Sequence, residues 1–535
     1  MAQRIPLSVV VIAKNEEENI RDCLTSVSWA DEIIIVDDYS TDRTVAVARE
    51  FTDKVFQRKM DVEGTHRNYA YNLAKNAWVL SLDADERVTD ELRQEIEAVL
   101  PHADDHKAFT IPIRAYLGDY WIRHGGWYPA GKVRLFDRRF FKYEEVEVHP
   151  RVFIDGPCGH LKKDIIHYSY RDFSDFLRSV DNQTTLEAKK WFNERRKIGA
   201  LKAVRKTVDR FLKTYYVKEG RRDGMVGFMV AYFNGLYQLL SYAKYWQMQK
   251  QVTRHKSQDT SHRSPVTGKR FEKKLPVTAA IIAKNEEENI GLCLESLGWA
   301  DEVLVVDGCS TDRTVERAME YGAKVVQHAF SGSFADDRNI ALKTSRNDWV
   351  LHIDADDIIT EDFVAQLEKA LKRLDGKTAV FKFRRNNFFL GHCMRFGGWR
   401  HYIPNLVNKT MVRYEGKVHE VPVFSGDIGI IHADIEHHPF KTVSQFVAKQ
   451  NRYTSIKAEE MFEKEGPMDD EVIWKKMRQK ALRTFSKSYL KKAGFRDGFY
   501  GFLFGFLFSM IDVLTWAKFW HLCHTKMRTR PSGAR

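Results

Sequence analysis

The feature that most constrains this chain is an internal duplication. The nine residues at 12–20 (IAKNEEENI) recur unchanged at 282–290, and shorter matches follow in the same order along both halves. These are STDRTV at Ser40 and Ser310, D-A-D at Asp83 and Asp354, G-G-W at Gly125 and Gly397, and AKYW at Ala243 against AKFW at Ala517. A repeat on this scale predicts that the chain folds as two copies of one unit.

Length agrees with this division. With 535 residues, the chain exceeds the size at which one hydrophobic core stops growing, roughly 250 to 300 residues. We place the first copy at 1–250 and the second at 275–524. Between them, residues 251–274 are polar, basic and almost without apolar side chains, as expected of an exposed linker. Residues 525–535 form a short basic tail.

Composition excludes several classes of protein. Hydrophobic residues make up 43% and charged residues 30%, which is typical of a folded globular chain. The six cysteines form no C-x-x-C pair, so neither a disulfide framework nor a zinc site is indicated. The net charge of +12 fits an anionic membrane surface or phosphate-bearing ligands as readily as nucleic acid. The short apolar run before Lys14 lacks the features of a secretory signal, so we expect a cytosolic protein.

Within each copy, apolar runs of strand length alternate with helical stretches. In the first copy the predicted strands are 9–12, 33–36 and 79–82, and the predicted helices are 17–27, 42–51 and 90–100. This alternation is typical of an α/β fold with a mostly parallel sheet flanked by helices. Ligands of such sheets bind beyond the carboxyl ends of the strands.

Acidic residues follow these strands. Asp83 and Asp85 close one strand of the first copy, and Asp354 and Asp356 close the matching strand of the second. Carboxylates two residues apart on an extended chain point to the same side. Each pair can therefore address one hard divalent cation, Mg²⁺ or Mn²⁺, that also binds diphosphate oxygens. The alternative is a strand-to-helix turn with acidic caps.

Two further polar segments lie at the same predicted edge. Asn15, followed three residues later by Glu18, could form a capping box at the start of a helix. Asp37 and Asp38 follow the second strand, where a carboxylate could accept a hydrogen bond from a nucleobase or a ribose hydroxyl. Helix capping is an equally good explanation of this second segment.

Taken together, the segments AKNEEENI, VDDYSTDRT, HRNYA, LDADERV, GGWYP and RLF resemble the family 2 glycosyltransferases of the GT-A fold. The resemblance is strongest to the bacterial branch that acts on the lipopolysaccharide core. It implies two tandem GT-A-like domains that move a sugar with inversion from a nucleotide-sugar donor, a UDP-sugar above all, with a divalent cation at the D-x-D acids.

The resemblance also implies roles for individual residues. Asp37 and Asp307 would contact the nucleoside of the donor, and Arg134 would steady its phosphates, a task that suits a bidentate guanidinium. Other residues implied at the donor sites are Asn15, Glu16, Arg67, Asn285, Glu286 and Arg338. The acids implied at the cation are Asp83, Asp85, Asp354 and Asp356.

The two copies differ at positions that bear on chemistry. If the G-G-W motifs are aligned, Leu406 replaces Arg134, which predicts a lost phosphate ligand in the second copy. Inversion needs a base that takes the proton of the acceptor hydroxyl. The second copy offers His419 and Glu420 for this task, whereas the first offers His149, which precedes a proline, and Glu147.

The apolar tails of the copies bear on location. Residues 498–511 and their counterpart 225–240 are apolar, with lysines and arginines just upstream. Neither is a clean span of about 20 apolar residues. We expect these helices to be amphipathic and to lie in an anionic interface, with a buried core helix and a spanning helix as the alternatives.

The sequence thus predicts a metal-dependent, inverting glycosyltransferase, in which both copies could be active. We expect it on the cytoplasmic face of a bacterial membrane, with a glycan or glycolipid acceptor and without nucleic acid as a partner. A membrane-bound scaffold that binds nucleotide or glycan without catalysis is the rival from another class. A nucleotidyltransferase would use the same acids and metal but release pyrophosphate.

Overall fold

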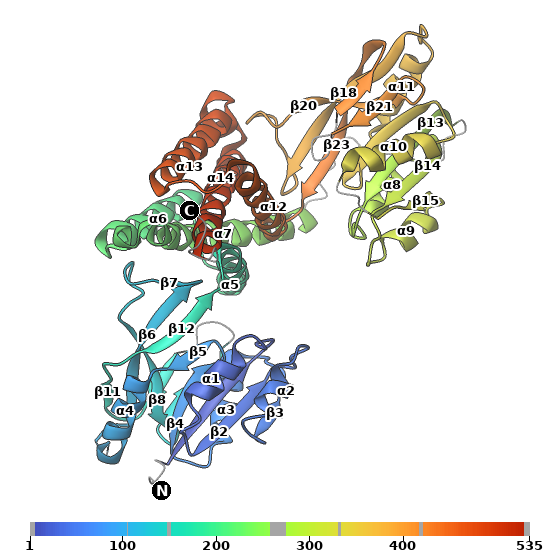
Figure 1. The fold of residues 1–535 in the computed structure, drawn as a ribbon. Coiled ribbons are helices and arrows are strands. Elements are labelled where there is room, and N and C mark those ends of the chain that lie inside the picture. The colour runs from blue at the N-terminus through green and yellow to red at the C-terminus, as the bar shows by residue number, and fades with distance from the viewer. Residues whose placement is uncertain are drawn as a thin grey trace, which may run out of the picture. The chain divides into compact units, whose positions relative to one another are not determined.

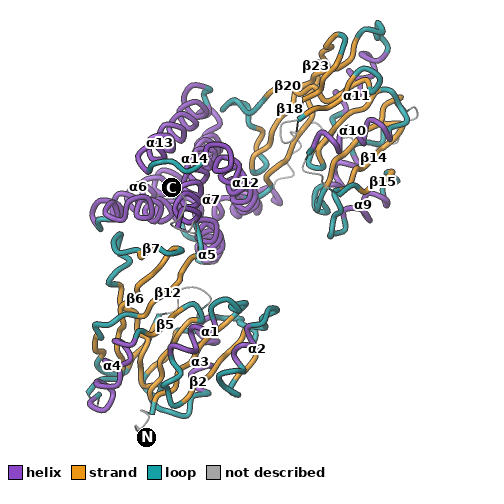
Figure 2. Tube along the Cα trace, in the orientation of Figure 1, coloured by secondary structure: helices purple, strands orange, loops and turns teal. Residues whose placement is uncertain are grey.

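A computed structural model describes residues 6–103, 105–146, 151–256, 274–329, 333–416 and 421–528. The chain forms two compact units. The first contains Met1–Met248, Val447–Arg478 and Val513–Arg535, and the second contains Gln249–Phe446 and Gln479–Asp512. Each unit is built on one large mixed sheet flanked by helices, which confirms the α/β prediction (Figures 1 and 2).

The sheet of the first unit has the strand order β3-β2-β1-β4-β8-β6-β12-β5. Strands β3, β2, β1 and β4 run parallel, and the antiparallel strand β8 joins them to β6. The strands are β1 (Leu7–Ala13), β2 (Glu32–Asp37), β3 (Val55–Gln57), β4 (Trp78–Asp83), β5 (Glu86–Val88), β6 (Ala108–Leu117), β7 (Tyr120–Trp121), β8 (Ala130–Asp137), β9 (Phe141–Tyr143), β10 (Val152–Ile154), β11 (Cys158–His160) and β12 (Ile165–Tyr170).

Helices cover both faces of this sheet. Successive residues of β1 point to opposite faces, and because they are apolar on both, each face needs a covering layer. Val9 and Val11 pack in one core with α1 (Ile20–Ser26), α2 (Thr44–Ala48) and α4 (Asp90–Val99). Val10 packs in the other core with α3 (Glu63–Asn72) and the β9–β10 hairpin. A short 3-10 turn, η1 (Leu100–His102), follows α4.

The second unit repeats this arrangement, with the order β15-β14-β13-β16-β20-β18-β23-β17. The strands are β13 (Leu275–Ala283), β14 (Ala300–Asp307), β15 (Lys324–Gln327), β16 (Trp349–Asp354), β17 (Asp357–Ile358), β18 (Thr378–Phe389), β19 (His392–Cys393), β20 (His401–Asn408), β21 (Val412–Glu415), β22 (Val421–Phe424) and β23 (Asp427–Phe440). The helices beside this sheet are α8 (Ile290–Glu295), α9 (Thr314–Glu320), α10 (Phe334–Thr344) and α11 (Glu361–Leu371).

Long helices follow each sheet in sequence. They are α5 (Phe173–Asn193), α6 (Ala200–Leu212) and α7 (Gly224–Lys256) in the first copy, and α12 (Val443–Glu465), α13 (Asp470–Phe485) and α14 (Gly498–Arg528) in the second. The turns between helices are η2 (Lys213–Val217), η3 (Gly220–Asp223), η4 (Ser486–Lys491) and η5 (Gly494–Asp497).

The compact units divide the chain differently from the two sequence copies. Parts of α12, α13 and α14 belong to the first unit, where Trp474 packs edge to face on Phe228 with ring centroids 5.0 Å apart. Helix α7 also continues to Lys256, past the expected boundary at 250. The rest of the expected linker, 257–273, and the end of the expected basic tail, 529–535, lie outside the described residues.

The apolar tail segments are largely covered by the chain itself. Most large apolar side chains of the segment 225–240 in α7 are buried, among them Met229, Phe233 and Leu236. In α14, Phe504 packs on Trp399 with ring centroids 4.7 Å apart. Among the described residues, Gly494–Lys526 is the one helix whose length and composition would allow it to cross a membrane, and 56% of its most apolar window is buried. This burial argues against the interfacial placement that we expected for these segments.

Two buried lysines tie the long helices of the first unit together. Lys244 of α7 donates to Asp181 Oδ1 at 2.7 Å and to the hydroxyls of Thr184 and Thr185 in α5. Lys518 of α14 makes the matching contacts in α12, where the place of Asp181 is taken by Asn451, at 2.6 Å. Because this amide is uncharged, burial lowers the pKa of Lys518 to about 7.

Candidate active site

The carboxyl ends of β1, β2 and β4 meet at one edge of the first sheet, as expected for neighbouring parallel strands. A cavity of about 220 Å³ opens there. Side chains from the predicted motifs line it, namely Lys14, Glu16, Asp38, Asp83 and Asp85, together with Met60 and with His167 of β12. Sequence segments that lie far apart thus converge on one cavity.

Asp83 is held by two arginines. Its Oδ1 accepts a hydrogen bond from Arg67 Nη2 at 3.0 Å, and its Oδ2 accepts one from Arg134 Nη2 at 2.8 Å. Burial alone would raise the pKa of Asp83, but the two guanidinium charges outweigh burial and keep the pKa well below its usual range. Asp83 is therefore an ionised carboxylate that is fixed in position.

Arg134 and Glu86 form a buried ion pair behind Asp83. Arg134 Nη2 lies 2.5 Å from Glu86 Oε1, and both residues are buried. Burial raises the pKa of Glu86 despite the neighbouring guanidinium. Arg134 is not among the residues that line the cavity, and in this structure it bonds carboxylates. Its observed contacts are therefore those of a group that positions Asp83.

Asp85 pairs with a residue that the sequence reasoning missed. His167 of β12 lies with its Nε2 3.1 Å from Asp85 Oδ2. Burial would lower the pKa of His167, but the hydrogen bond to Asp85 and the nearby acidic charges raise it. A signal was present in the sequence, because the second copy has His437 at the strand position that matches His167. The recurrence of this histidine becomes informative only once β12 is known to lie beside the D-A-D turn.

The second unit builds the same charge cluster with a different arginine. Arg385 Nη2 lies 2.6 Å from Asp354 Oδ2 and also bonds Asp357, which is the counterpart of Glu86. Burial raises the pKa of Asp357 to about 6. Burial would also raise the pKa of Asp354, but Arg385 and Arg338 lower it.

The predicted loss of an arginine in the second unit therefore needs correction. Leu80 pairs with Leu135 in the first sheet, and its counterpart Leu351 pairs with Leu406 in the second. Asn405, and not Leu406, thus matches Arg134. The G-G-W alignment was wrong by one residue at this strand because the intervening loops differ in length. The guanidinium itself is retained by Arg385, on the neighbouring strand.

Three side chains of the second unit converge as a possible cation site. One ligand atom from each of Asp354, Asp356 and His437 lies within 4.8 Å of the others. Two carboxylate oxygens and an imidazole nitrogen are suitable ligands for Mn²⁺, and the oxygens also suit Mg²⁺. The residues present therefore fit a divalent cation.

The expected nucleoside contacts Asp37 and Asp307 are fully buried at the ends of β2 and β14. Asp37 accepts from the backbone N–H of Ser40 at 3.0 Å and from Gln57 Nε2 at 3.1 Å. Asp307 likewise accepts from the backbone N–H of Ser310 at 3.0 Å. Both carboxylates thus bind the segment that follows the second strand, and neither caps the next helix, because α2 begins at Thr44 and α9 at Thr314.

Asp38 lines the cavity in place of Asp37. Its Oδ2 lies 2.6 Å from Lys14 Nζ. Burial opposes ionisation of Asp38, but the hydrogen bond from Lys14 and the backbone N–H of Met60 lower its pKa. The second unit has Gly308 here, where an added Cβ would lie 3.2 Å from Lys284 Cβ. The two units therefore differ at this position.

Asn15 and Asn285, which follow the first strand of each unit, connect two loops. Asn15 does not form a capping box with Glu18. Asn15 Oδ1 accepts from the backbone N–H of Thr41 at 2.8 Å, and Asn285 accepts from Thr311 in the same way. Helix α1 instead begins at Ile20. Glu16 accepts from Asn19 and Glu286 from Asn289, and burial raises the pKa of Glu16, which faces the cavity.

The four candidates for the base, Glu147, His149, His419 and Glu420, lie outside the described residues. The described neighbours show where their segments emerge. In the first unit the segment connects β9 to β10, which pair with each other beside α3. In the second unit it connects β21 to β22.

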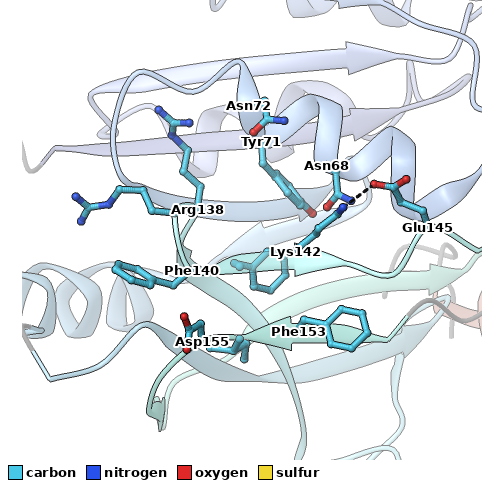
Figure 3. Close-up of a pocket in the computed structure, with 12 residues that line it drawn as sticks. Asn68, Tyr71, Asn72, Arg138, Phe140, Lys142, Glu145, Phe153 and Asp155 are labelled. Atoms are coloured by element: carbon cyan, nitrogen blue, oxygen red, sulfur yellow. Dashed lines mark ion pairs between the residues drawn. The ribbon is translucent and has the colours of Figure 1, made fainter.

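A second cavity of about 660 Å³ lies between α3 and the β9–β10 hairpin. Figure 3 shows Tyr71 and Asn72 of α3 on one side and Phe140, Phe153 and Lys142 on the other, with Lys142 paired to Glu145. It shares none of its lining residues with the cavity at Asp83. These two cavities of the first unit are therefore separate, and the clustered acids line the smaller one.

Comparison with known proteins identifies a family for both units. The model of glycosyl transferase family 2 matches residues 8–166 and 278–439. The lipopolysaccharide core biosynthesis glycosyltransferase LpsC of Rhizobium meliloti is 25% identical over 254 residues, which cover 46% of this chain and 94% of that protein. An uncharacterized glycosyltransferase of Rickettsia typhi is 27% identical over 237 residues, covering 42% of this chain and 80% of the relative.

Two solved structures show similarity to parts of this chain. Glucosyl-3-phosphoglycerate synthase of Mycobacterium tuberculosis, solved with Mn²⁺ and UDP, is 27% identical over 21% of this chain and 44% of that chain, with a TM-score of 0.19. TarS of S. aureus, residues 1–349, is 15% identical over 46% of this chain and 92% of that chain, with a TM-score of 0.25. Both TM-scores are low, so the fold assignment rests on the strand order and the family match.

Proposed function

The chain belongs to glycosyl transferase family 2, and on that premise we propose that it transfers sugars, with inversion and with the help of a divalent cation, to a glycan or glycolipid acceptor at a membrane. The family match and the related glycosyltransferases make it a glycosyltransferase that uses a nucleotide sugar. The acceptor class, the cation and the stereochemistry belong to the proposal. The observation that carries it is the cluster of Asp354, Asp356 and His437 within 4.8 Å.

Each unit would hold its donor at the carboxyl ends of the central strands. Asp83, Asp85 and His167 would hold the cation in the first unit, and Asp354, Asp356 and His437 would hold it in the second. When bound, the cation supplies positive charge next to the diphosphate that leaves.

The arginines behind the acids have a distinct task in this proposal. Arg134 and Arg385 keep Asp83 and Asp354 ionised and fixed, so the carboxylates need little reorganisation when the cation and donor bind. The base that takes the proton of the acceptor hydroxyl would come from the segments with His149 and Glu147 or with His419 and Glu420. No covalent intermediate on the enzyme is required.

The membrane part of the proposal rests on chemistry and relatives. LpsC acts, by its name, in lipopolysaccharide core biosynthesis, and an acceptor of that kind is anchored in a membrane. The chain carries a net charge of +12, which favours contact with anionic lipid. We therefore propose a peripheral location on the cytoplasmic face of the bacterial inner membrane.

The proposal is tested by incubating the purified protein with a panel of nucleotide sugars, with Mg²⁺ or Mn²⁺ and with chelator. We expect binding or turnover of at least one donor that depends on the cation. Asp85→Asn should reduce transfer by the first unit at least about 100-fold, because a ligand to the cation is lost. Asp53→Asn is the matched control, because this exposed residue lies before β3 at the opposite edge of the sheet. If no donor shows cation-dependent binding or turnover, the proposal is wrong.

A further inference from the structure

We propose that the outward face of α6 and the turn that follows it docks on an anionic lipid surface. This inference deepens the membrane part of the proposed function by naming the contact surface, which differs from the apolar tail helices. We call this surface the α6 ridge. Its apolar members are Leu201, Val208, Leu212, Tyr216 and Val217.

The α6 ridge is unusually apolar for a solvent-exposed surface. Leu201 is 88% exposed, Val208 49%, Leu212 43%, Tyr216 55% and Val217 75%. Leu201, Val208 and Leu212 are spaced by seven and four residues, which places them on one side of the helix. Scattered apolar side chains need no explanation, but a continuous exposed row of them indicates a binding surface.

The opposite side of α6 is already occupied. Ala203 is buried, and α6 approaches α7 so closely at Gly235 that an added Cβ there would lie 2.9 Å from the backbone oxygen of Thr207. The helix is therefore fixed against α7 within the first unit. Its row of apolar side chains faces outward because the packed side cannot accommodate it.

Positive charge surrounds the row. Residues 200–222 contain two acidic residues, Asp209 and Glu219, and both lie near arginines, Arg205 at 3.7 Å and Arg222 at 2.8 Å. The same stretch contains eight basic residues: Lys202, Arg205, Lys206, Arg210, Lys213, Lys218, Arg221 and Arg222. An apolar row flanked by lysines and arginines is the pattern of helices that lie in a lipid interface, where cations reach headgroup phosphates and apolar side chains enter the acyl boundary.

The second unit carries part of the same pattern, at two matching positions. Leu482 and Leu490 occupy the places of Val208 and Tyr216 in the repeat, and they are 70% and 57% exposed. Phe495 is 51% exposed. The segment 479–496 contains six basic residues and no acidic one. Exposed apolar side chains thus recur at matching positions of both copies, which is unexpected for surface residues without a shared task.

An anionic bilayer fits this surface better than a soluble polyanion does. Nucleic acid or a soluble anionic glycan would bind the basic side chains alone and would leave Leu201, Val208 and Leu212 in water. Insertion of these side chains in a lipid interface removes them from water, which favours binding. The apolar side chains of α7 cannot provide this contact because most of them are buried.

The test is sedimentation of the full-length protein with vesicles of phosphatidylcholine alone and of phosphatidylcholine with phosphatidylglycerol. We expect binding to the anionic vesicles that weakens with salt. Val208→Ser, Leu212→Ser and Tyr216→Ser together should lower the partition coefficient at least about 10-fold, because three inserted side chains are lost. Adding Leu482→Ser and Leu490→Ser should abolish binding.

Leu292→Ser with Met319→Ser is the matched control. These residues are 48% and 61% exposed on the sheet-covering helices α8 and α9, so each of them resembles the substituted residues of the α6 ridge in exposure. We expect the control to bind as the wild type does. Binding of the five-substitution variant at the wild-type level, or no binding of the wild type to either vesicle, would overturn the inference. Cation-dependent consumption of a nucleotide sugar, measured without vesicles on the same proteins, tests the proposed transferase chemistry separately.

Discussion

At the scale of single residues, two buried arginines hold the acids of the two sites in position. Arg134 and Arg385 reach their acidic partners from different strands. Ile113 pairs with Ile165, two residues before His167, and Arg385 pairs with Ile435, two residues before His437. Arg385 therefore occupies the place of Ile113, while Asn405 occupies the place of Arg134. The two units thus form the same charge cluster with an arginine that comes from one or the other of two neighbouring strands.

This exchange predicts a rescue. Arg385→Ile should destabilise the second unit by about 3 kcal/mol, because it leaves Asp357 buried without its cationic partner. Adding Asn405→Arg should restore most of that loss, since the double variant has the residues of the first unit at both places. The measurement is the free energy of unfolding in urea, followed by circular dichroism. Failure of Asn405→Arg to recover any stability would show that the two positions are not interchangeable.

Much of the site could be predicted from sequence at this scale, and the failures have physical causes. The D-A-D acids and the cavity-facing Glu16 were found because they directly follow apolar strands. His167 and Arg385 come from β12 and β18, whose neighbours in the sheet are set by long-range pairing that a local pattern does not contain. Asp37 was assigned to the nucleoside, but its carboxylate is satisfied by Ser40 and Gln57, and local sequence cannot distinguish those two uses.

At the scale of elements, the long helices connect through buried lysines with unequal partners. Lys518 faces Asn451, and burial lowers the pKa of Lys518 to about 7. Burial also lowers the pKa of Lys244, but the charge of Asp181 opposes the shift. In unfolded chains lysine titrates near pH 10.4. Between pH 7 and that value the unfolded state therefore binds the extra proton, and stability rises with pH.

We expect the first unit to gain about 2 kcal/mol of unfolding free energy between pH 7 and pH 9 from Lys518 alone. Asn451→Asp should remove most of this dependence, because a carboxylate keeps the folded-state lysine protonated. Asp181→Asn should create a similar dependence through Lys244. Urea unfolding at several pH values gives the slopes. Equal slopes for the wild type and Asn451→Asp would contradict the assignment.

The bounds of the strands were predicted more accurately than those of the helices. The strands 9–12, 33–36 and 79–82 lie inside β1, β2 and β4, and α4 begins at Asp90 as expected, because each has a continuous apolar pattern. Helices α1 and α2 are shorter than predicted. Their first turns, with Glu17 and Asp42, are used in loop contacts between the two segments, where Asp42 accepts from the backbone N–H of Glu17 at 3.1 Å. The tail helix α7 was expected at an interface but packs inside the unit, since composition alone does not identify the neighbour of an apolar helix.

At the scale of the whole molecule, the duplication produced two sheets with the same strand order and two acidic clusters with different surroundings. The first unit has Asp38 beside its cavity, whereas the second has Gly308. The second unit brings Asp354, Asp356 and His437 together. We therefore propose that each unit holds its own donor and that the two differ in affinity or specificity. Two active units could add sugars to one acceptor in turn.

The measurement that tests this account most directly is calorimetric titration of UDP in the presence of Mn²⁺. It should be made on the wild type, on Asp83→Asn with Asp85→Asn, and on Asp354→Asn with Asp356→Asn, with product size followed in parallel. We predict two binding events in the wild type, one in each variant, none with chelator, and a different product from each variant. If both variants lose the same single event and the same activity to the same extent, the units act as one site, and the claim of two separate donor sites is wrong.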